Sequence, residues 1–162
     1  MNILYLHGLD GRLTEEKRSI LEKHGTVHSP ELDYRKDKNS IENLLHDYKD
    51  KNISVVIGSS MGGFAGYYVA NALQVPALLF NPALAYRSVH QEIPKTLSST
   101  SNFKYLVLGA NDDLILPKDT LKFIANSIGK DNYNLNIKQG LEHRIPVPIF
   151  REEVDTFFER LK

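Results

Sequence analysis

Residues 54–68 read SVVIGSSMGGFAGYY, and this stretch decides the predicted fold. A run of β-branched residues leads into two serines enclosed by glycines, and an almost wholly apolar helical pattern follows. Residues 58–62 match Gly-x-Ser-x-Gly with Ser60 at the centre, a pattern typical of a sharp turn from a buried strand into a buried helix. Such a turn strains its central residue and lifts that side chain clear of the sheet. A flexible Gly-Ser connection is the alternative interpretation, but the position between a buried strand and a buried helix favours the sharp turn.

Working outward from this turn, short apolar runs predict further strands. Runs that are continuously apolar are typical of strands buried on both faces, as in a parallel sheet. Residues 134–138 alternate between polar and apolar instead, which predicts a position nearer an edge, and residues 26–29 form the weakest candidate. The continuous runs are NILYL (2–6), VVI (55–57), ALLF (77–80) and YLVL (105–108).

Helical patterns lie between these runs. Thr14 can cap a first helix whose opening turn carries Glu15 and Glu16, since acidic side chains are favoured at the positive end of a helix. Residues 64–73 are apolar nearly all round, which predicts a deeply buried helix. The remaining stripes are Ile41, Leu44, Leu45 and Tyr48; Leu121, Ile124, Ala125 and Ile128; and Phe150, Val154, Phe157, Phe158 and Leu161.

Strand and helix therefore alternate along nearly the whole chain. This order predicts an α/β fold with a mostly parallel sheet of about six strands flanked by helices, in one domain over residues 1–162. One stretch breaks the rhythm: residues 86–102 are polar, contain Pro94, and fit either a surface loop or a short flap over a site.

A serine hydroxyl is a weak nucleophile unless a base lies beside it, and the base is usually a histidine held by a carboxylate. With a Gly-x-Ser-x-Gly turn, the acid and then the histidine follow the serine along the chain. Asp112 and Asp113 follow the predicted strand 105–108, and His143 follows the last strand. We expect Ser60, Asp112 and His143 to form a catalytic triad, with Asp113 as the alternative acid and His90 as a distant alternative base.

An acyl-transfer site also needs backbone N–H groups that stabilise the oxyanion of the tetrahedral intermediate. One donor is the amide that follows the nucleophile, which belongs to Met61. The other comes from the loop after the first strand, where Gly8 allows a close backbone approach and leaves the amide of Leu9 as the expected donor. His7 in the same loop is interpreted as a structural support rather than a second base.

Composition excludes several classes of function. The chain has 20 Lys and Arg against 20 Asp and Glu, so it lacks the basic excess of a nucleic-acid or anionic-membrane binder. It has no cysteine, which excludes disulfides, thiolate metal sites and a cysteine nucleophile. No signal peptide and no apolar run long enough to span a membrane is visible, so we expect a soluble, cytoplasmic protein. The oligomeric state stays open.

The chain resembles the α/β-hydrolase superfamily and, within it, the small bacterial YqiA-like serine esterases. The shared segments occur in the family's order over nearly the whole length. Asp10 departs from the pattern, because an uncharged polar residue is more usual there, and residues 84–94 match only loosely. The segments are YLHGLDG (5–11), SPELDY (29–34), GSSMGGFAGYYVA (58–70), LFNPAL (79–84), LVLGANDDLI (106–115) and GLEHRIP (140–146).

This resemblance implies a minimal serine esterase or thioesterase, with Ser60, Asp112 and His143 as its triad and the strand order 2-1-3-4-5-6. The short connection between the fourth and fifth strands predicts little or no lid, and hence an exposed site for a small ester or thioester. No metal or organic cofactor is expected. The alternatives are a catalytically silent scaffold that binds a ligand, and a different reaction with the same triad, such as acyl transfer, peptide cleavage or perhydrolysis.

Overall fold

A computed structural model describes residues 1–94, 102–126 and 132–162. In this part of the chain, six strands form one sheet in the order β2-β1-β3-β4-β5-β6. Every neighbouring pair is parallel, which confirms the predicted sheet and its strand order. The strands are β1 (Asn2–Leu6), β2 (Thr26–His28), β3 (Ile53–Ser59), β4 (Ala77–Phe80), β5 (Phe103–Gly109) and β6 (Asn132–Lys138).

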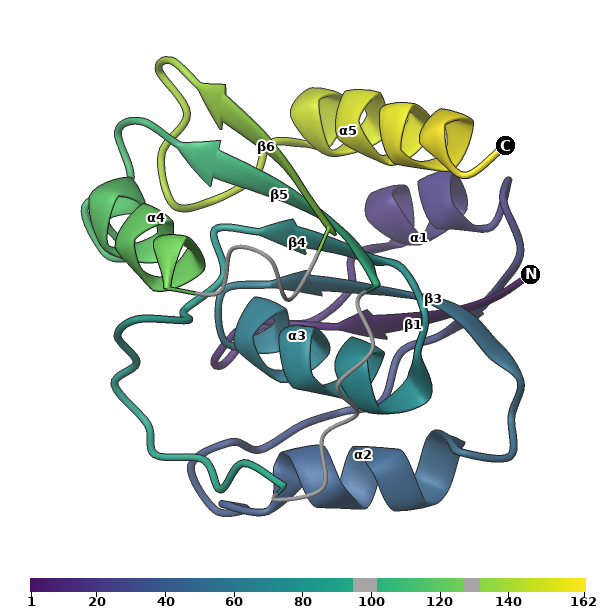
Figure 1. Ribbon diagram of the computed structural model, residues 1–162. Helices are drawn as coiled ribbons and strands as arrows, with labels where there is room; N and C mark the ends of the chain where they lie inside the picture. Colours follow the sequence, from purple (N-terminus) through teal and green to yellow (C-terminus); the bar gives the residue numbers. More distant parts are fainter. Residues whose placement is uncertain (95–101, 127–131) are drawn as a thin grey trace.

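Helices cover both faces of the sheet. Helices α1 and α5 lie on one face, and α2, α3 and α4 lie on the other (Figure 1). Since neighbouring residues of a strand point to opposite faces, each central strand contributes to two separate cores. The helices are α1 (Glu15–Leu21), α2 (Ser40–Tyr48), α3 (Met61–Leu73), α4 (Pro117–Ala125) and α5 (Val147–Arg160).

Residues at the starts of the helices explain why the helices begin where they do. The Thr14 side chain accepts a hydrogen bond from the Lys17 amide at the start of α1, as expected of a capping residue. Pro117 opens α4, where a missing N–H costs no helical hydrogen bond. Helix α3 is buried along most of its length, as its all-round apolar pattern predicts.

Strand β6 lies at an edge, as its alternating pattern predicts, but its apolar side chains are the more exposed ones. Leu135 and Ile137 are exposed by 41% and 44%. The polar residues that alternate with them face helix α5: Asn136 donates to the buried carboxylate of Glu153 on α5, and Lys138 pairs with the same group. A buried acid on α5 therefore sets which face of β6 turns inward.

The structure partly describes the stretch that the sequence left open. Gln91 is buried and its side chain donates to the backbone oxygens of Tyr34 and Asp37, so the chain at residues 91–92 packs against the segment before α2. Residues 95–101 lie outside the described part, and so does Ile128, which the sequence placed on the stripe of α4. No helix in the described ranges is long and apolar enough to cross a membrane.

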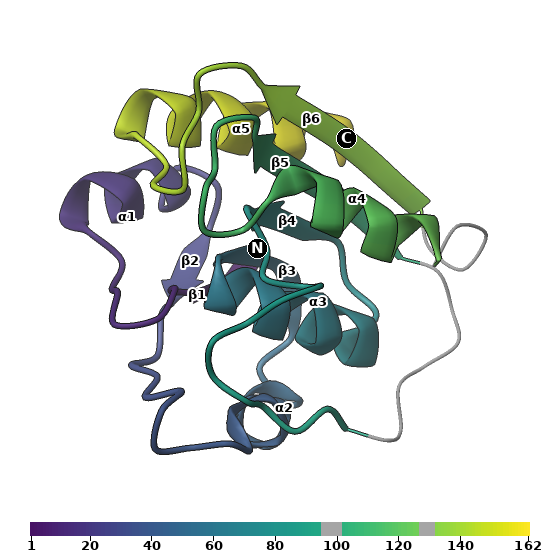
Figure 2. The ribbon, with the colours of Figure 1, turned by 90° about the vertical axis from the view of Figure 1, so that its left-hand side faces the viewer.

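Figure 2 views the molecule from the left-hand side of Figure 1, where the strands end. The loops that follow β1, β3, β4, β5 and β6 all leave the sheet at this edge, because parallel strands end on the same side. The predicted functional residues are distributed over these loops, so the topology gathers them in space.

Candidate active site

Ser60 occupies the turn between β3 and α3 in a strained conformation. Its φ and ψ are 55° and −117°, a region that residues with a side chain rarely adopt. Two backbone hydrogen bonds hold it: the Ser60 amide donates to the oxygen of Phe80, and the amide of Ala83 donates to the oxygen of Ser60. The loop after β4 thus fixes the turn after β3.

The glycines on either side of Ser60 are required by space. A Cβ atom on Gly58 would lie 2.2 Å from the Gly62 carbonyl oxygen, and one on Gly62 would lie 2.0 Å from the oxygen of Leu6. Both distances are far below van der Waals contact. A side chain at position 58 would push β3 away from the start of α3, and one at position 62 would push the start of α3 away from the end of β1. The Gly-x-Ser-x-Gly spacing is therefore required because helix α3 starts in direct contact with the neighbouring strand.

The structure brings together the three side chains that the sequence singled out. His143 Nε2 lies 3.1 Å from Ser60 Oγ, and His143 Nδ1 lies 2.8 Å from Asp112 Oδ2. An ionised carboxylate can only accept, so Nδ1 carries the proton and Nε2 is free to accept from the serine hydroxyl. The Asp112 carboxylate is fully buried, whereas the His143 side chain is 21% exposed.

Asp112 is held by its own loop. Its Oδ1 atom accepts hydrogen bonds from the amides of Leu114 and Ile115, each at 2.9 Å, while Oδ2 faces His143. A buried carboxylate needs such donors to remain charged. The alternative acid, Asp113, is exposed and does not contact His143, and the alternative base, His90, is exposed and pairs with Glu92.

Asn81 is a site residue to which the sequence analysis gave no role. Its Nδ2 atom donates to the backbone oxygens of Glu142 and His143, and its Oδ1 atom accepts from the amide of Gly109. Asn81 is 1% exposed and has a positive φ of 41°. The available signal was an asparagine directly after a buried strand, at a place where asparagine tolerates a left-handed backbone.

The loop after β1 lines the site beside Ser60. A tight turn joins the Gly8 oxygen to the Gly11 amide at 3.0 Å, and a Cβ on Gly8 would lie 3.3 Å from Ser60 Cβ. His7 Nε2 accepts from the Leu32 amide, so its Nδ1 carries the proton and donates to the Gly8 oxygen at 2.7 Å. With both ring nitrogens engaged and the side chain buried, His7 supports this loop as the sequence indicated.

A pocket of about 660 Å³ opens above Ser60. Both residues expected to stabilise an oxyanion, Leu9 and Met61, line it together with Ser60 and His143. Met61 begins α3, so the partial positive charge at that helix end faces the space above Ser60. Tyr86, Leu114 and Ile115 add apolar surface on the side of the β4 and β5 loops.

Two charged side chains that line the pocket, those of Asp10 and Lys17, have lowered pKa values. The side chain of Asp10 accepts two hydrogen bonds from Arg35, which lower the pKa of the Asp10 carboxyl. This pairing accounts for a charge where the family pattern has an uncharged residue. Burial lowers the pKa of Lys17, whose Nζ atom donates to the backbone oxygen of Ile145 at 2.8 Å.

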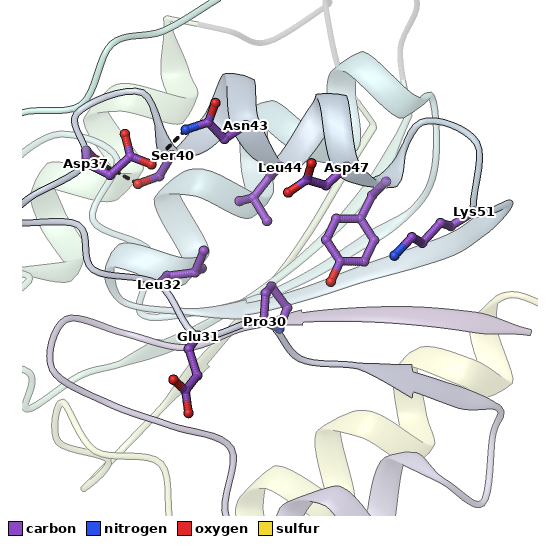
Figure 3. A pocket seen from close by; sticks show the side chains of 10 residues that line it. Pro30, Glu31, Leu32, Asp37, Ser40, Asn43, Leu44, Asp47 and Lys51 are labelled. Atoms are coloured by element: carbon purple, nitrogen blue, oxygen red, sulfur yellow. Dashed lines mark hydrogen bonds between the residues drawn. The ribbon is translucent and has the colours of Figure 1, made fainter.

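A second hollow lies apart from these residues. It has a volume of about 500 Å³ between α2 and the segment 30–32, and Glu31, Asp37 and Asp47 give it an acidic lining (Figure 3). None of the predicted site residues contributes to it. Within the described ranges, no group of three or more His, Asp or Glu side chains is arranged to hold a metal ion.

Comparison with known proteins assigns the chain to a family. The family model described as an uncharacterised protein family (UPF0227) matches residues 2–114, which include Ser60, Asn81 and Asp112. The chain belongs to this family. It is the YqiA-like family that the sequence resemblance indicated. No curated protein sequence matches the chain.

Solved structures show that this UPF0227 member has the α/β-hydrolase fold. SOBER1 from Arabidopsis thaliana is 13% identical with a TM-score of 0.69, over 100% of this chain and 99% of that one. Est1E from Butyrivibrio proteoclasticus is 16% identical with a TM-score of 0.70, covering 98% and 87%. The α/β-hydrolase domain-containing protein 10 from mouse is 14% identical with a TM-score of 0.71, covering 99% and 90%. At these identities the likeness shows the fold and carries no activity across.

Proposed function

We propose that this UPF0227 member is a serine hydrolase that cleaves a small carboxylic ester or thioester through an acyl-enzyme on Ser60. One observation carries the proposal: the Ser60 hydroxyl, the His143 imidazole and the buried Asp112 carboxylate form a continuous hydrogen-bonded chain, with distances of 3.1 and 2.8 Å. The order serine, histidine, carboxylate is the one that activates a hydroxyl as a nucleophile.

In the proposed reaction, Ser60 Oγ attacks the acyl carbonyl while His143 Nε2 takes the hydroxyl proton. Asp112 holds the proton on Nδ1 and stabilises the imidazolium. The amides of Leu9 and Met61 stabilise the oxyanion, and His143 then gives its proton to the leaving alcohol or thiol. A water molecule, deprotonated by His143, cleaves the acyl-enzyme and regenerates Ser60.

The size of the pocket supports a small substrate. Its volume of about 660 Å³ lies within the range of sites for drug-sized ligands, and residues 81–102 are the whole connection between β4 and β5. An open cleft that lacks a large lid domain suits short acyl groups better than long chains that need a cover.

A fluorophosphonate probe tests the nucleophile directly, because it reacts only with an activated serine. We expect the wild-type protein to be labelled on Ser60 and the Ser60→Ala variant to remain unlabelled, with mass spectrometry locating the adduct. Ser59→Ala is the matched control, since it removes the neighbouring hydroxyl and should leave labelling intact. No labelling of the wild-type protein would favour the catalytically silent scaffold.

A panel of acyl esters and thioesters of graded length then defines the reaction. We expect release of acid from short esters or thioesters that depends on Ser60. If an added amine or alcohol captured the acyl group in preference to water, the reaction would be acyl transfer, and hydrolysis would be the wrong assignment.

A further inference from the structure

Positive charge is concentrated in the lining of the pocket above Ser60. Four cationic residues contribute to it: Arg12, Lys17, Arg87 and Arg144. The whole chain carries equal numbers of basic and acidic residues, so this excess is a local property of the site. Among the described residues, no carboxylate forms an ion pair with any of the four.

The acidic residue in the pocket lining does not neutralise the charge of these cations. Asp10 is the one acid among the described residues that line the pocket, and its carboxylate is already paired with Arg35 at 2.8 Å. The Arg35 side chain is not part of the lining. The pocket therefore presents cations that no carboxylate of the described residues neutralises by an ion pair, and a concave surface of one sign concentrates ligands of the opposite sign.

Arg87 is the one of these four cations that has a buried hydrogen-bond donor without an acceptor. Its guanidinium lies over the ring of Phe64, with Cζ 4.2 Å from the ring centre, and its Nε atom is buried with no hydrogen-bond partner. Phe64 lies one turn after Ser60 on α3. A buried guanidinium N–H without a hydrogen-bond acceptor costs free energy, and an anion supplied from outside the chain would offset that cost.

Lys17 differs from Arg87 in this respect. Its ammonium donates to the Ile145 oxygen and lies over the ring of Phe150, so it has a structural role between α1 and the segment before α5. Arg12 and Arg144 are exposed and solvated. Of the four, Arg87 combines partial burial, a fixed ring contact and an unused donor.

We propose that Arg87 binds an anionic group of the substrate, so that the site prefers esters or thioesters that carry a carboxylate or phosphate. This specificity rests on the hydrolase function proposed above. Arg12, Lys17 and Arg144 add to the positive potential, which draws such a substrate to the pocket.

Two matched substrate pairs test the proposal and locate the anion. Mono-4-nitrophenyl adipate against its methyl ester places the charge on the acyl side, and 3-carboxyphenyl butyrate against its methyl ester places it on the leaving group. We expect one charged substrate to exceed its methyl ester by about tenfold or more in kcat/KM, as a charge-assisted hydrogen bond allows. The ratio should fall to about one in Arg87→Gln and persist in Lys118→Gln, a charge loss on α4 outside the pocket.

The proposal is wrong if neither charged substrate is preferred, or if the preference survives in Arg87→Gln. Binding of adipate to Ser60→Ala, measured by calorimetry, provides a readout that needs no turnover. If no ester is cleaved and the probe fails to label Ser60, the hydrolase function fails. In that case, adipate that binds Ser60→Ala but not the double variant Ser60→Ala/Arg87→Gln would still support the anion site. If adipate did not bind Ser60→Ala at all, the anion site would be overturned.

Discussion

At the scale of single residues, Ser60 and Asp112 are both held in unfavourable states by their surroundings. A serine with φ of 55° costs about 1–3 kcal/mol, and the bonds to Phe80 and Ala83 offset that strain. A carboxylate without solvent contact is costly, and two amides together with His143 satisfy its oxygens. Both side chains are therefore oriented before any substrate arrives, which is the condition for effective catalysis.

The neighbouring acids Asp112 and Asp113 give a prediction at this scale. Asp112→Asn keeps the shape but favours the wrong imidazole tautomer, so we expect kcat to fall by about 10³–10⁴-fold on the ester that the wild-type protein cleaves best. Asp113→Asn, an exposed neighbour, is the matched control and should retain activity within about threefold. The assignment would be reversed if Asp113→Asn alone abolished turnover.

At the scale of the elements, the site depends on how the loops after four strands are joined. The loop after β3 carries Ser60, that after β5 carries Asp112 and that after β6 carries His143. Asn81, from the loop after β4, bonds to the backbone of both the β5 and the β6 segments. It is a positioning residue, because it contacts no reacting atom and holds the backbone of His143.

Asn81→Asp tests this role with almost no change in shape. The new oxygen would face the carbonyls of Glu142 and His143 where an amide donor was, so two hydrogen bonds become repulsive contacts. We expect a loss of unfolding free energy of about 2–4 kcal/mol and a fall in kcat of about tenfold or more, with KM less affected.

The control for this change is Asn39→Asp, the same substitution at an exposed position before α2. It should leave both kcat and the denaturation midpoint close to those of the wild-type protein. Fluorophosphonate labelling adds a readout of site geometry: slower labelling of Asn81→Asp at a temperature where it is fully folded indicates a displaced His143. An unchanged labelling rate would reduce Asn81 to a purely structural residue.

At the scale of the whole molecule, the parallel sheet buries side chains on both faces, and some of these side chains carry polar groups that are buried as well. Tyr5 on β1 is 4% exposed, and burial raises the pKa of its hydroxyl to about 12. Tyr34 is 1% exposed, donates to the oxygen of His7, and has its pKa raised by burial as well. Both hydroxyls resist ionisation as long as the chain is folded.

Alkaline stability follows from this burial. The unfolded chain loses the Tyr5 proton near pH 10 and the folded chain near pH 12, so the unfolded state is favoured as the pH rises through this window. For Tyr5 the predicted loss of unfolding free energy is about 3 kcal/mol, and this loss begins only when the pH rises above about 10. Tyr5→Phe should show a shallower decline in urea-unfolding free energy between pH 9 and 12. Tyr86→Phe, at a residue 66% exposed, should keep the wild-type slope.

Sequence patterns predicted most of the fold because a doubly covered parallel sheet has a strong signature. The continuous apolar runs at 2–6 and 77–80 coincide with β1 and β4, and the Gly-x-Ser-x-Gly spacing located the turn at Ser60. Strand β6 shows the limit of this prediction: its alternation indicated an edge, but the side facing inward is the polar one, because Glu153 on the following helix, α5, is buried there. Such a pairing depends on how the strand and the helix pack together, and the strand's own pattern does not reveal it.

The alternation of strands and helices, the position of the sharp turn and the candidate residues 60, 112 and 143 followed from the sequence itself, since periodicity and steric demands act over a few neighbouring residues. The strand order came instead from the resemblance to a family. Tertiary structure decided which of two adjacent acids meets the imidazole, that Asn81 ties three loops together, and that four cations line one pocket. The reason is that these relations link residues far apart in the sequence, such as Asn81 and His143 at a separation of 62 positions, and only the folded sheet brings them together.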